Sequence, residues 1–382
     1  MAIKTIMPDE LKINEPVKWH IYDGSGRLLI KEGMKLRSQS QIDKLIALEA
    51  FYRIIEEEAD NTEIIEGAIN TALSPFEQIE ELLDNMERLF ETIVHEPAHS
   101  RKKLPEKLEE LGDSVISLCE YDVDAVIGAI HIDQKHCYAI KHPLHCAVLS
   151  YVLAMKKGIQ NRLLNTLVCA AITSNIGMFE LQRGELMRHR GPLTALQRDK
   201  VEKHTMRSSV LLKRIGVKNK LWHEIVLQHH EKADGTGYPR TLAGKKFIIE
   251  ARILGLVDRY GAMVAPREYR QAMAPTKALQ QLFKERGPEV DAKLGALLIK
   301  EMGIYPPGAS VVLANKEVAI VTRRGEDRMK PIVKSIYSFE GGKRYPKPIT
   351  HDSEVQMHRI MGLVELPGDY VVDLYELWDY TH

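Results

Sequence analysis

Several features that usually reveal a protein's partner are scarce in this sequence of 382 residues. Its four cysteines include no CxxC pair, so we expect reduced, mostly packed thiols rather than a disulfide framework. The 53 basic and 53 acidic residues give a formal net charge of zero, and hence no drive toward nucleic acid or an anionic membrane. No apolar run approaches the length of a bilayer span, and the first residues lack the apolar core of a signal peptide. These absences predict a cytoplasmic protein with no membrane span and no nucleic-acid partner.

What the chain does contain is the composition of a soluble globular protein, with 44% apolar and 28% charged residues. Its length suggests two or three domains. The predicted fold class is mainly α, with a central helical domain flanked by a small N-terminal α+β module and a small C-terminal β module. The predicted boundaries are 1–66 for the N-terminal module, 67–103 for a linker helix, 104–304 for the helical domain and 305–382 for the β-rich module.

Turn and capping residues mark the first two modules. Apolar segments at 17–22 and 27–30 flank a glycine-containing turn, which predicts a β-hairpin. Further on, Ser74, Pro75 and Glu77 form a helix start with a capping box. The helix that follows carries an apolar stripe at Ile79, Leu83, Met86, Phe90 and Ile93. This stripe suits either an ordinary core helix or the seam of a homodimer, and both interpretations stay open.

Histidine is concentrated in the middle of the chain, where nine of the 15 lie between His131 and His230. Imidazole is the commonest metal ligand, so this clustering predicts a metal site there. The sharpest pattern runs from His229 to Pro239 and reads His-His-Glu-Lys-Ala-Asp-Gly-Thr-Gly-Tyr-Pro. Its glycines and proline cannot continue a helix. The two imidazoles are therefore predicted at the C-terminal end of a helix, beside a rigid loop that carries Tyr238.

In chain order, the middle region offers a constellation of polar residues: His142, Ser174, Asn175, His204, His229, His230 and Asp258. The supporting motifs are the complete HHExxDGxGYP pattern, Gly191-Pro192-Leu193-Thr194, the segment from Asp258 to Met263, and Arg267, Tyr269 and Arg270 as R-x-Y-R. Over about half of the chain, this order resembles an HD-GYP domain, a branch of the HD metal-dependent phosphohydrolases. The resemblance implies an all-helical HD-type fold for the central domain.

The HD-GYP family hydrolyses cyclic di-GMP to pGpG, and sometimes on to GMP, at a cluster of two or three metals, commonly iron or manganese. The resemblance therefore implies a bacterial signalling protein that binds cyclic di-GMP or a related nucleotide, with diguanylate cyclase (GGDEF) domains as further partners. Metals in such a site neutralise phosphodiester oxygens and supply hydroxide at neutral pH. The implied metal ligands are His142, His204, His229, His230 and Asp258. The implied ligand-binding residues are Asp234, Gly235, Gly237, Tyr238, Pro239, Arg267 and Arg270.

The sequence departs from the family at its name-giving histidine-aspartate pair. Where the family has a motif close to H-D-I-G-K, this chain reads Ser174, Asn175, Ile176, Gly177 and Met178. Serine is a poor ligand beside imidazole, asparagine carries no charge, and methionine replaces a lysine that would face phosphate. Tyr138 and Gly261 likewise stand where the family has carboxylates. We therefore expect no full dinuclear or trinuclear centre. The remaining ligands either hold one transition-metal ion, with iron or manganese ahead of zinc or nickel, or pack into a collapsed site without metal, and both interpretations stay open.

Three functions stay open on this pattern. The first is a catalytically impaired HD-GYP protein that acts as a nucleotide-binding sensor or as an adaptor. The second is an active cyclic di-GMP phosphodiesterase with an altered metal site. The third is a structural interaction protein that binds no nucleotide. His145 and His223 are alternative ligands by helical spacing, although we expect both to be ordinary core or surface residues.

Overall fold

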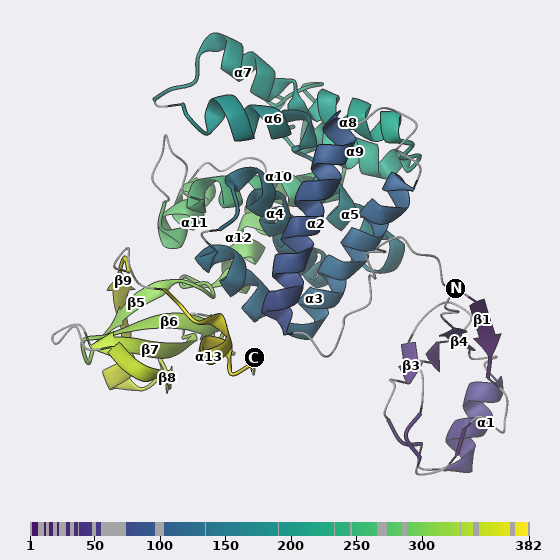
Figure 1. The fold of residues 1–382 in the computed structure, drawn as a ribbon, viewed down its shortest axis with the longest axis vertical. Helices are drawn as coiled ribbons and strands as arrows, with labels where there is room; N and C mark the ends of the chain where they lie inside the picture. Colours follow the sequence, from purple (N-terminus) through teal and green to yellow (C-terminus); the bar gives the residue numbers. More distant parts are fainter. Residues whose placement is uncertain are drawn as a thin grey trace. The chain divides into compact units, whose positions relative to one another are not determined.

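A computed structural model describes the chain over residues 2–6, 11–12, 15–17, 21–22, 28–30, 34–36, 38–47, 51–54, 74–95, 103–133, 135–189, 191–232, 234–244, 247–265, 273–284, 289–328, 330–338, 344–366 and 371–380. The fold is mainly α-helical, as predicted, with one antiparallel sheet in the N-terminal part of the chain and another in the C-terminal part (Figure 1). The chain divides into two compact units, residues 1–64 and 65–382. The finer division of residues 65–382 into a linker helix, a helical domain and a β module stays a prediction.

The first unit is a four-stranded antiparallel sheet with one helix. Its strands follow the order β1-β4-β2-β3. The antiparallel pairing of β2 with β3 confirms the predicted hairpin. Ile42 and Leu45 of the helix are buried in a small apolar core with Ile21. The elements are β1 (Ala2–Thr5), β2 (Ile21–Tyr22), β3 (Leu28–Ile30), α1 (Gln39–Ala47) and β4 (Phe51–Ile54).

The second unit is organised around α4 (Tyr138–Lys156), whose residues from His142 to Ala154 are all buried. A helix buried on every side belongs at the centre of a bundle. Its most extensive packing is with α3 (Leu104–Ile132), α5 (Asn161–Thr173) and α10 (Ile249–Val264). The remaining helices are α2 (Pro75–His95), η3 (Ile176–Met178), α6 (Phe179–Leu181), η4 (Gln182–Leu186), α7 (Ala195–Glu202), α8 (His204–Ile215), α9 (Lys220–Gln228), α11 (Pro275–Lys284) and α12 (Glu289–Met302).

Helix α2 settles the question raised by its apolar stripe. Ser74 and Glu77 form the predicted capping box, with Ser74 N donating to Glu77 at 2.8 Å and Glu77 N donating to Ser74 Oγ at 3.3 Å. The stripe from Ile79 to Ile93 is buried in the main core of the unit and packs on α3. Because the same side chains cannot also face a second chain, the dimer-seam interpretation of this stripe is wrong.

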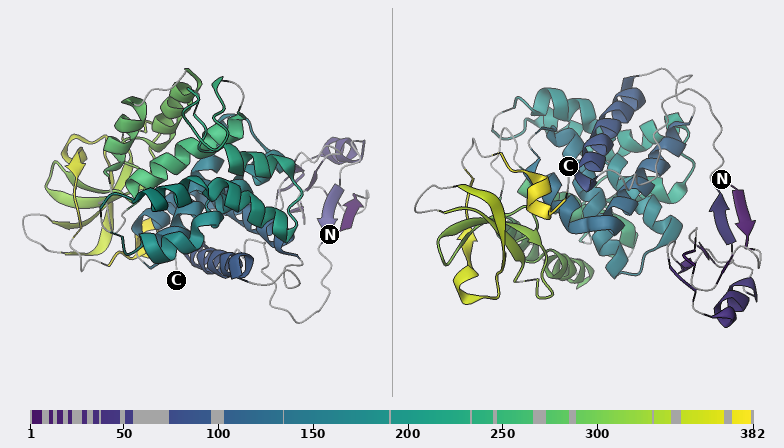
Figure 2. Two further views of the ribbon diagram at one scale, coloured as in Figure 1. Left: turned by 90° about the horizontal axis from the view of Figure 1, so that it is seen from above. Right: turned by 60° about the horizontal axis from the view of Figure 1, so that its bottom comes forward.

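The C-terminal residues form a five-stranded antiparallel sheet in the order β8-β7-β6-β5-β9 (Figure 2). The strands β5 (Ser310–Leu313), β6 (Glu317–Arg323) and β7 (Ile332–Ser338) lie in the C-terminal part that was predicted to be rich in β-strands. It also contains β8 (Arg344–Asp352), β9 (Ile360–Leu363), η6 (Gln356–His358) and α13 (Leu374–Trp378). Strand β8 contains Pro346 and Pro348, and a strand with prolines is tolerated at a sheet edge, where this one lies.

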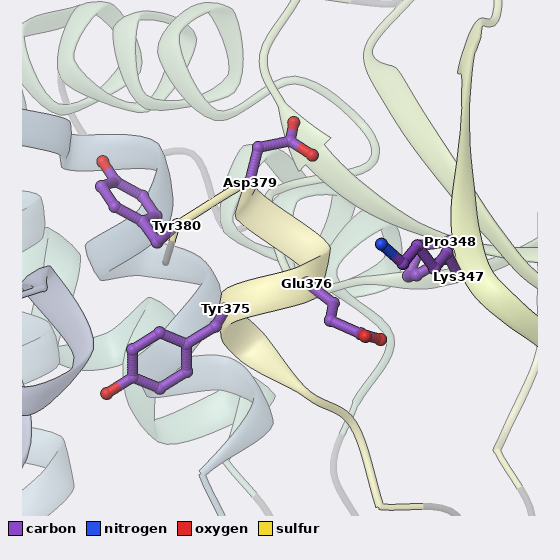
Figure 3. A pocket seen from close by; sticks show the side chains of 6 residues that line it. All are labelled: Lys347, Pro348, Tyr375, Glu376, Asp379 and Tyr380. Atoms are coloured by element: carbon purple, nitrogen blue, oxygen red, sulfur yellow. The ribbon is translucent and has the colours of Figure 1, made fainter. Parts of the chain in front are cut away.

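Helix α13 and the loop before β5 join this sheet to the helices. The Trp378 indole lies directly over Gly128, where an added Cβ would approach its ring to 2.2 Å. Its Nε1 donates to Thr322 O at 2.9 Å. Nδ1 of His131, near the end of α3, lies 2.7 Å from Pro307 O. Beside α13 is a pocket of about 260 Å³ lined by Lys347, Pro348, Tyr375, Glu376, Asp379 and Tyr380 (Figure 3).

Among the described residues, one segment, 161–186, is long and apolar enough to cross a membrane, judged by length and composition alone. Inside the protein, 72% of the apolar stretch in this segment is buried. The sequence analysis missed it because the segment combines several short helical elements. The chain turns at Ser174 and Asn175, in the middle of this segment. The same turn carries the two residues that stand at the family's name-giving pair.

Candidate metal centre

Four helices bring the five predicted metal ligands together. His142 lies in the first turns of α4, His204 begins α8, and Asp258 lies on α10. His229 and His230 follow α9 (Lys220–Gln228), so they lie directly after the helix at whose C-terminal end they were predicted. Two groups of metal-ligand atoms result, each with all of its atoms within 4.8 Å of one another. The first group is His204, His229 and His230, and the second is His142, Cys146 and Asp258.

In the first group, the backbone orients two imidazoles so that their Nε2 atoms face each other. Nδ1 of His229 donates to Val226 O at 2.8 Å, and Nδ1 of His204 donates to Val201 O. A carbonyl can only accept, so each Nδ1 carries the proton and each Nε2 presents a lone pair. The two Nε2 atoms are 3.4 Å apart. Two facing lone pairs suit a shared cation, and metal-bound histidines usually donate their other ring N–H to a carbonyl in this way.

Burial keeps these imidazoles neutral. It lowers the pKa of His204 to about 3, with the neighbouring His229 as the second cause. Burial likewise lowers the pKa of His229, and it holds the pKa of His230 well below its usual range. A metal binds the neutral form of imidazole, so the group is in the right protonation state near neutral pH.

Asp258 is the hub of the second group. Its Oδ1 accepts from His142 Nε2 at 2.9 Å and from Asn175 Nδ2 at 3.2 Å. Its Oδ2 lies 3.9 Å from His230 Nε2, which links the two groups. Burial alone would raise the pKa of Asp258, but the hydrogen bond from His142 and the surrounding imidazoles hold it well below its usual range. The buried carboxylate therefore stays charged.

The two residues at the name-giving pair behave differently from each other. Ser174 turns its hydroxyl back to its own helix and donates to Ala171 O at 3.0 Å. Asn175 points into the site, where its amide nitrogen contacts Asp258 and its Oδ1 is buried without a hydrogen-bond partner. Met178 is half-buried at the end of η3. Of the family's three polar positions here, only that of Asn175 contacts the described ligand cluster.

The loop after His230 is held by a buried glutamate. Glu231 accepts from Arg240 N at 2.6 Å and from Leu242 N at 2.8 Å, so one carboxylate ties down both ends of the Gly-Tyr-Pro turn. Asp234 accepts from the backbone and hydroxyl of Thr236 at 2.9 and 2.7 Å. These described contacts of Asp234 are internal to the loop.

Two glycines in this loop have geometric reasons. Gly235 has a φ of +78°, which other residues rarely adopt. At Gly237, an added Cβ would lie 2.3 Å from Lys232 N, so the backbone crosses itself too closely for any side chain. Pro239 follows a cis peptide bond. The shape of this loop thus requires glycine at both positions.

Tyr238 extends from this loop over the imidazoles. Its ring stacks on His230, with centroids 4.8 Å apart and an interplanar angle of 29°. It also lies edge-on to His204 at 6.4 Å. Burial raises the pKa of the Tyr238 hydroxyl, which therefore stays protonated. A half-exposed aromatic ring of this kind forms one wall of the metal centre.

Glu231→Gln is expected to loosen the loop and to lower the free energy of unfolding by about 1.5–3 kcal/mol, because one amide nitrogen would then face a backbone donor. Hydrogen exchange of the amides of residues 234–244, together with urea denaturation, measures the effect. Glu202→Gln, at an exposed position on α7, is the matched control and should change stability by less than about 0.5 kcal/mol. Unchanged exchange in the loop would show that Glu231 does not hold it.

Other predicted residues fall outside the cluster. Arg267 and Arg270 lie outside the described residues. His223 contacts Ser209 Oγ and Val217 O, at 3.1 and 2.9 Å, and is a structural residue, as expected. His145 packs on His131 and Tyr260 and belongs to neither donor group. Cys146 was missed because nothing in the sequence distinguishes it from a packed cysteine. Only its i+4 spacing from His142 could have suggested a shared face.

The donor set fits a transition metal. Imidazoles with backbone-bonded Nδ1 atoms and a charged carboxylate are ligands for first-row divalent ions. HD domains generally bind divalent metals, and the two donor groups agree with that property. The identity of the ion does not follow from these contacts.

Comparison with known proteins supports the same region. The model of the HD domain family matches residues 129–294. Cyclic di-GMP phosphodiesterase PA4108 of Pseudomonas aeruginosa is 24% identical over 67% of this chain and 62% of its own length. Cyclic di-GMP phosphodiesterase PdeB of Borreliella burgdorferi is 23% identical over 48% of each chain. The 3'3'-cGAMP-specific phosphodiesterase 3 of Vibrio cholerae is 29% identical over 46% of this chain and 38% of its own length.

The chain thus spans less than two thirds of the length of these relatives. Among solved structures, Bd1817, an HDG"Y"P protein from Bdellovibrio bacteriovorus, aligns with 78% of this chain and 98% of its own at 14% identity and a TM-score of 0.48.

Proposed function

This chain is an HD-GYP domain protein, and from that premise we propose that it is a catalytically impaired member that takes part in cyclic di-GMP signalling as a nucleotide-binding sensor or protein-interaction adaptor. The observation that carries the proposal is the contact between Asn175 and Asp258. An amide stands where the family has a metal-bridging carboxylate. The loop that carries Tyr238 retains the complete HHExxDGxGYP pattern. A site of this kind keeps the aromatic wall formed by Tyr238 but lacks the negative charge of the bridging carboxylate.

The metal in this proposal is a single transition-metal ion. The residues that would hold it are His142, His204, His229, His230 and Asp258, and on imidazole and carboxylate ligands alone we propose iron or manganese ahead of zinc or nickel. When bound, the ion would supply positive charge for phosphate oxygens. One carboxylate among the described ligands gives too little negative charge for two or three closely spaced divalent ions.

The substrate class is proposed from the relatives, whose names specify cyclic di-GMP or 3'3'-cGAMP. A cyclic dinucleotide offers flat bases and two phosphates. Tyr238 supplies an aromatic face, and Arg267 and Arg270 are the proposed phosphate partners. Diguanylate cyclase (GGDEF) domains are the proposed protein partners of the surface that carries Tyr238.

Tyr238→Ala is expected to weaken cyclic di-GMP binding about 10-fold, because stacking of one base on an aromatic ring contributes about 1–3 kcal/mol. Isothermal titration calorimetry with cyclic di-GMP measures the loss, and a pull-down with a GGDEF domain tests the adaptor role. Tyr121→Ala is the matched control, since this exposed tyrosine lies on α3. Absence of binding to both the nucleotide and the domain by the wild-type protein would refute the proposal.

An active phosphodiesterase is the alternative that the surviving ligands favour. Its test is turnover of cyclic di-GMP to pGpG with added manganese or iron. Turnover would show that the protein is an active phosphodiesterase. A folded protein without turnover in any metal would favour the role of sensor or adaptor. The remaining alternative, an interaction protein without nucleotide binding, loses one motive because the stripe on α2 is buried in the core of its own chain.

A further inference from the structure

A cysteine lies inside the metal centre. Sγ of Cys146 is 3.6 Å from His142 Nε2, and the two side chains are one helical turn apart on the same face of α4. Sγ, a ring nitrogen of His142 and a carboxylate oxygen of Asp258 are mutually within 4.8 Å. All three residues are buried. Three different donor types therefore surround one small volume.

The charges favour this group over the three imidazoles as the seat of the ion. His204, His229 and His230 offer only imidazole nitrogens, which bring no negative charge. Asp258 brings one, and a thiolate at Cys146 would bring a second. Two negative charges balance one divalent cation, so its burial leaves no net charge in the interior.

Asn175 provides an independent sign of a missing cation. Its Nδ2 donates to Asp258 Oδ1, which fixes the amide beside the carboxylate. Its Oδ1 is buried and has no hydrogen-bond partner. An unsatisfied buried carbonyl oxygen costs about 1–3 kcal/mol, and a cation beside Asp258 would satisfy it.

We propose that His142, Cys146 and Asp258, with the amide oxygen of Asn175 beside them, form a thiolate-containing site for one divalent transition metal. The inference rests on the proposed metal binding and changes its preference. Thiolate ligation favours zinc, iron or cobalt over manganese. On binding, the Cys146 thiol would release its proton to solvent. His142 would give up the Nε2 proton that it donates to Asp258 and take up one at Nδ1, so that the ring stays neutral and Nε2 is free to bind the ion. The thiolate supplies a negative charge close to the one that the family's lost aspartate would carry.

Cobalt(II) reports this ligand directly. Metal-free full-length protein titrated with cobalt(II) under anaerobic conditions is expected to show a near-ultraviolet thiolate-to-cobalt charge-transfer band with one ion per chain. Cys146→Ala removes the band and lowers zinc affinity at least about 10- to 100-fold, the loss that even an outer-shell change causes. Cys137→Ser, a half-exposed thiol that precedes α4, is the matched control and keeps the band.

X-ray absorption of zinc-loaded wild-type protein gives a second readout that needs no variant, with one sulfur ligand expected at about 2.3 Å. Zinc or cobalt bound with nitrogen and oxygen ligands alone would overturn the thiolate site while leaving a metal-binding sensor intact. Absence of any bound metal would overturn both metal proposals. Cyclic di-GMP calorimetry on the same metal-free sample tests the sensor role independently.

Discussion

Asp258→Ala is expected to abolish metal binding and to lower the free energy of unfolding by about 2 kcal/mol or more. Asp258 is buried and is the only carboxylate in the two donor groups of the described residues. Its removal leaves His142 Nε2 and the Asn175 amide as buried donors without their acceptor. Each such donor costs about 1–3 kcal/mol, which relief from burying a charge offsets in part. Zinc titration and chemical denaturation of the metal-free protein measure the two effects.

Asp199→Ala is the matched control for this change. Asp199 forms an exposed pair with Lys203 on the same chain, at 2.8 Å with both side chains 51% exposed. Such a pair contributes less than about 1 kcal/mol, so stability and metal binding should be almost unchanged. Wild-type metal affinity in Asp258→Ala would exclude Asp258 as a ligand.

Local signals in the sequence were sufficient for some elements of the fold and of the site. Ser74 forms the predicted capping box with Glu77, whose backbone N donates to Ser74 Oγ at 3.3 Å. The helix before His229 ends at Gln228, ahead of a loop with a positive φ at Gly235 that could not continue a helix. Caps and turns depend on residues only a few positions apart, and such patterns are visible in a sequence.

Contacts between distant residues could not be predicted in the same way. Asn175 and Asp258 are 83 positions apart, and only the packing of α5 and α10 on α4 makes them neighbours. The orphaned Oδ1 of Asn175 depends on that packing too. Cys146 belongs to a donor group because Asp258, on α10, lies close to it in the folded chain. The resemblance to the family indicated the five predicted ligands. It gave no information on Cys146, because this residue does not stand at a ligand position of the family.

Asn175→Asp is expected to make the stability of the protein depend on metal. The substitution would place a second carboxylate about where the amide nitrogen now lies, 3.2 Å from Asp258 Oδ1. Two carboxylates at this distance cannot both ionise freely, so one of them takes up a proton or the fold loses stability. We expect a loss of about 1–3 kcal/mol without metal. A divalent ion present at a free concentration of 100 times its Kd would restore about 2.7 kcal/mol of the free energy of unfolding.

Thermal unfolding with and without manganese or iron measures this dependence, and Asn161→Asp, at an exposed position, is the control that should show none.

The double change Ser174→His with Asn175→Asp then tests function, since it returns both the imidazole and the bridging charge. If the native protein is catalytically impaired at this pair, the double variant hydrolyses cyclic di-GMP to pGpG above the wild-type level. Equal stability of Asn175→Asp with and without metal would mean that no cation binds beside Asp258, because an ion shared by two buried carboxylates would stabilise the folded variant by the free energy of its binding.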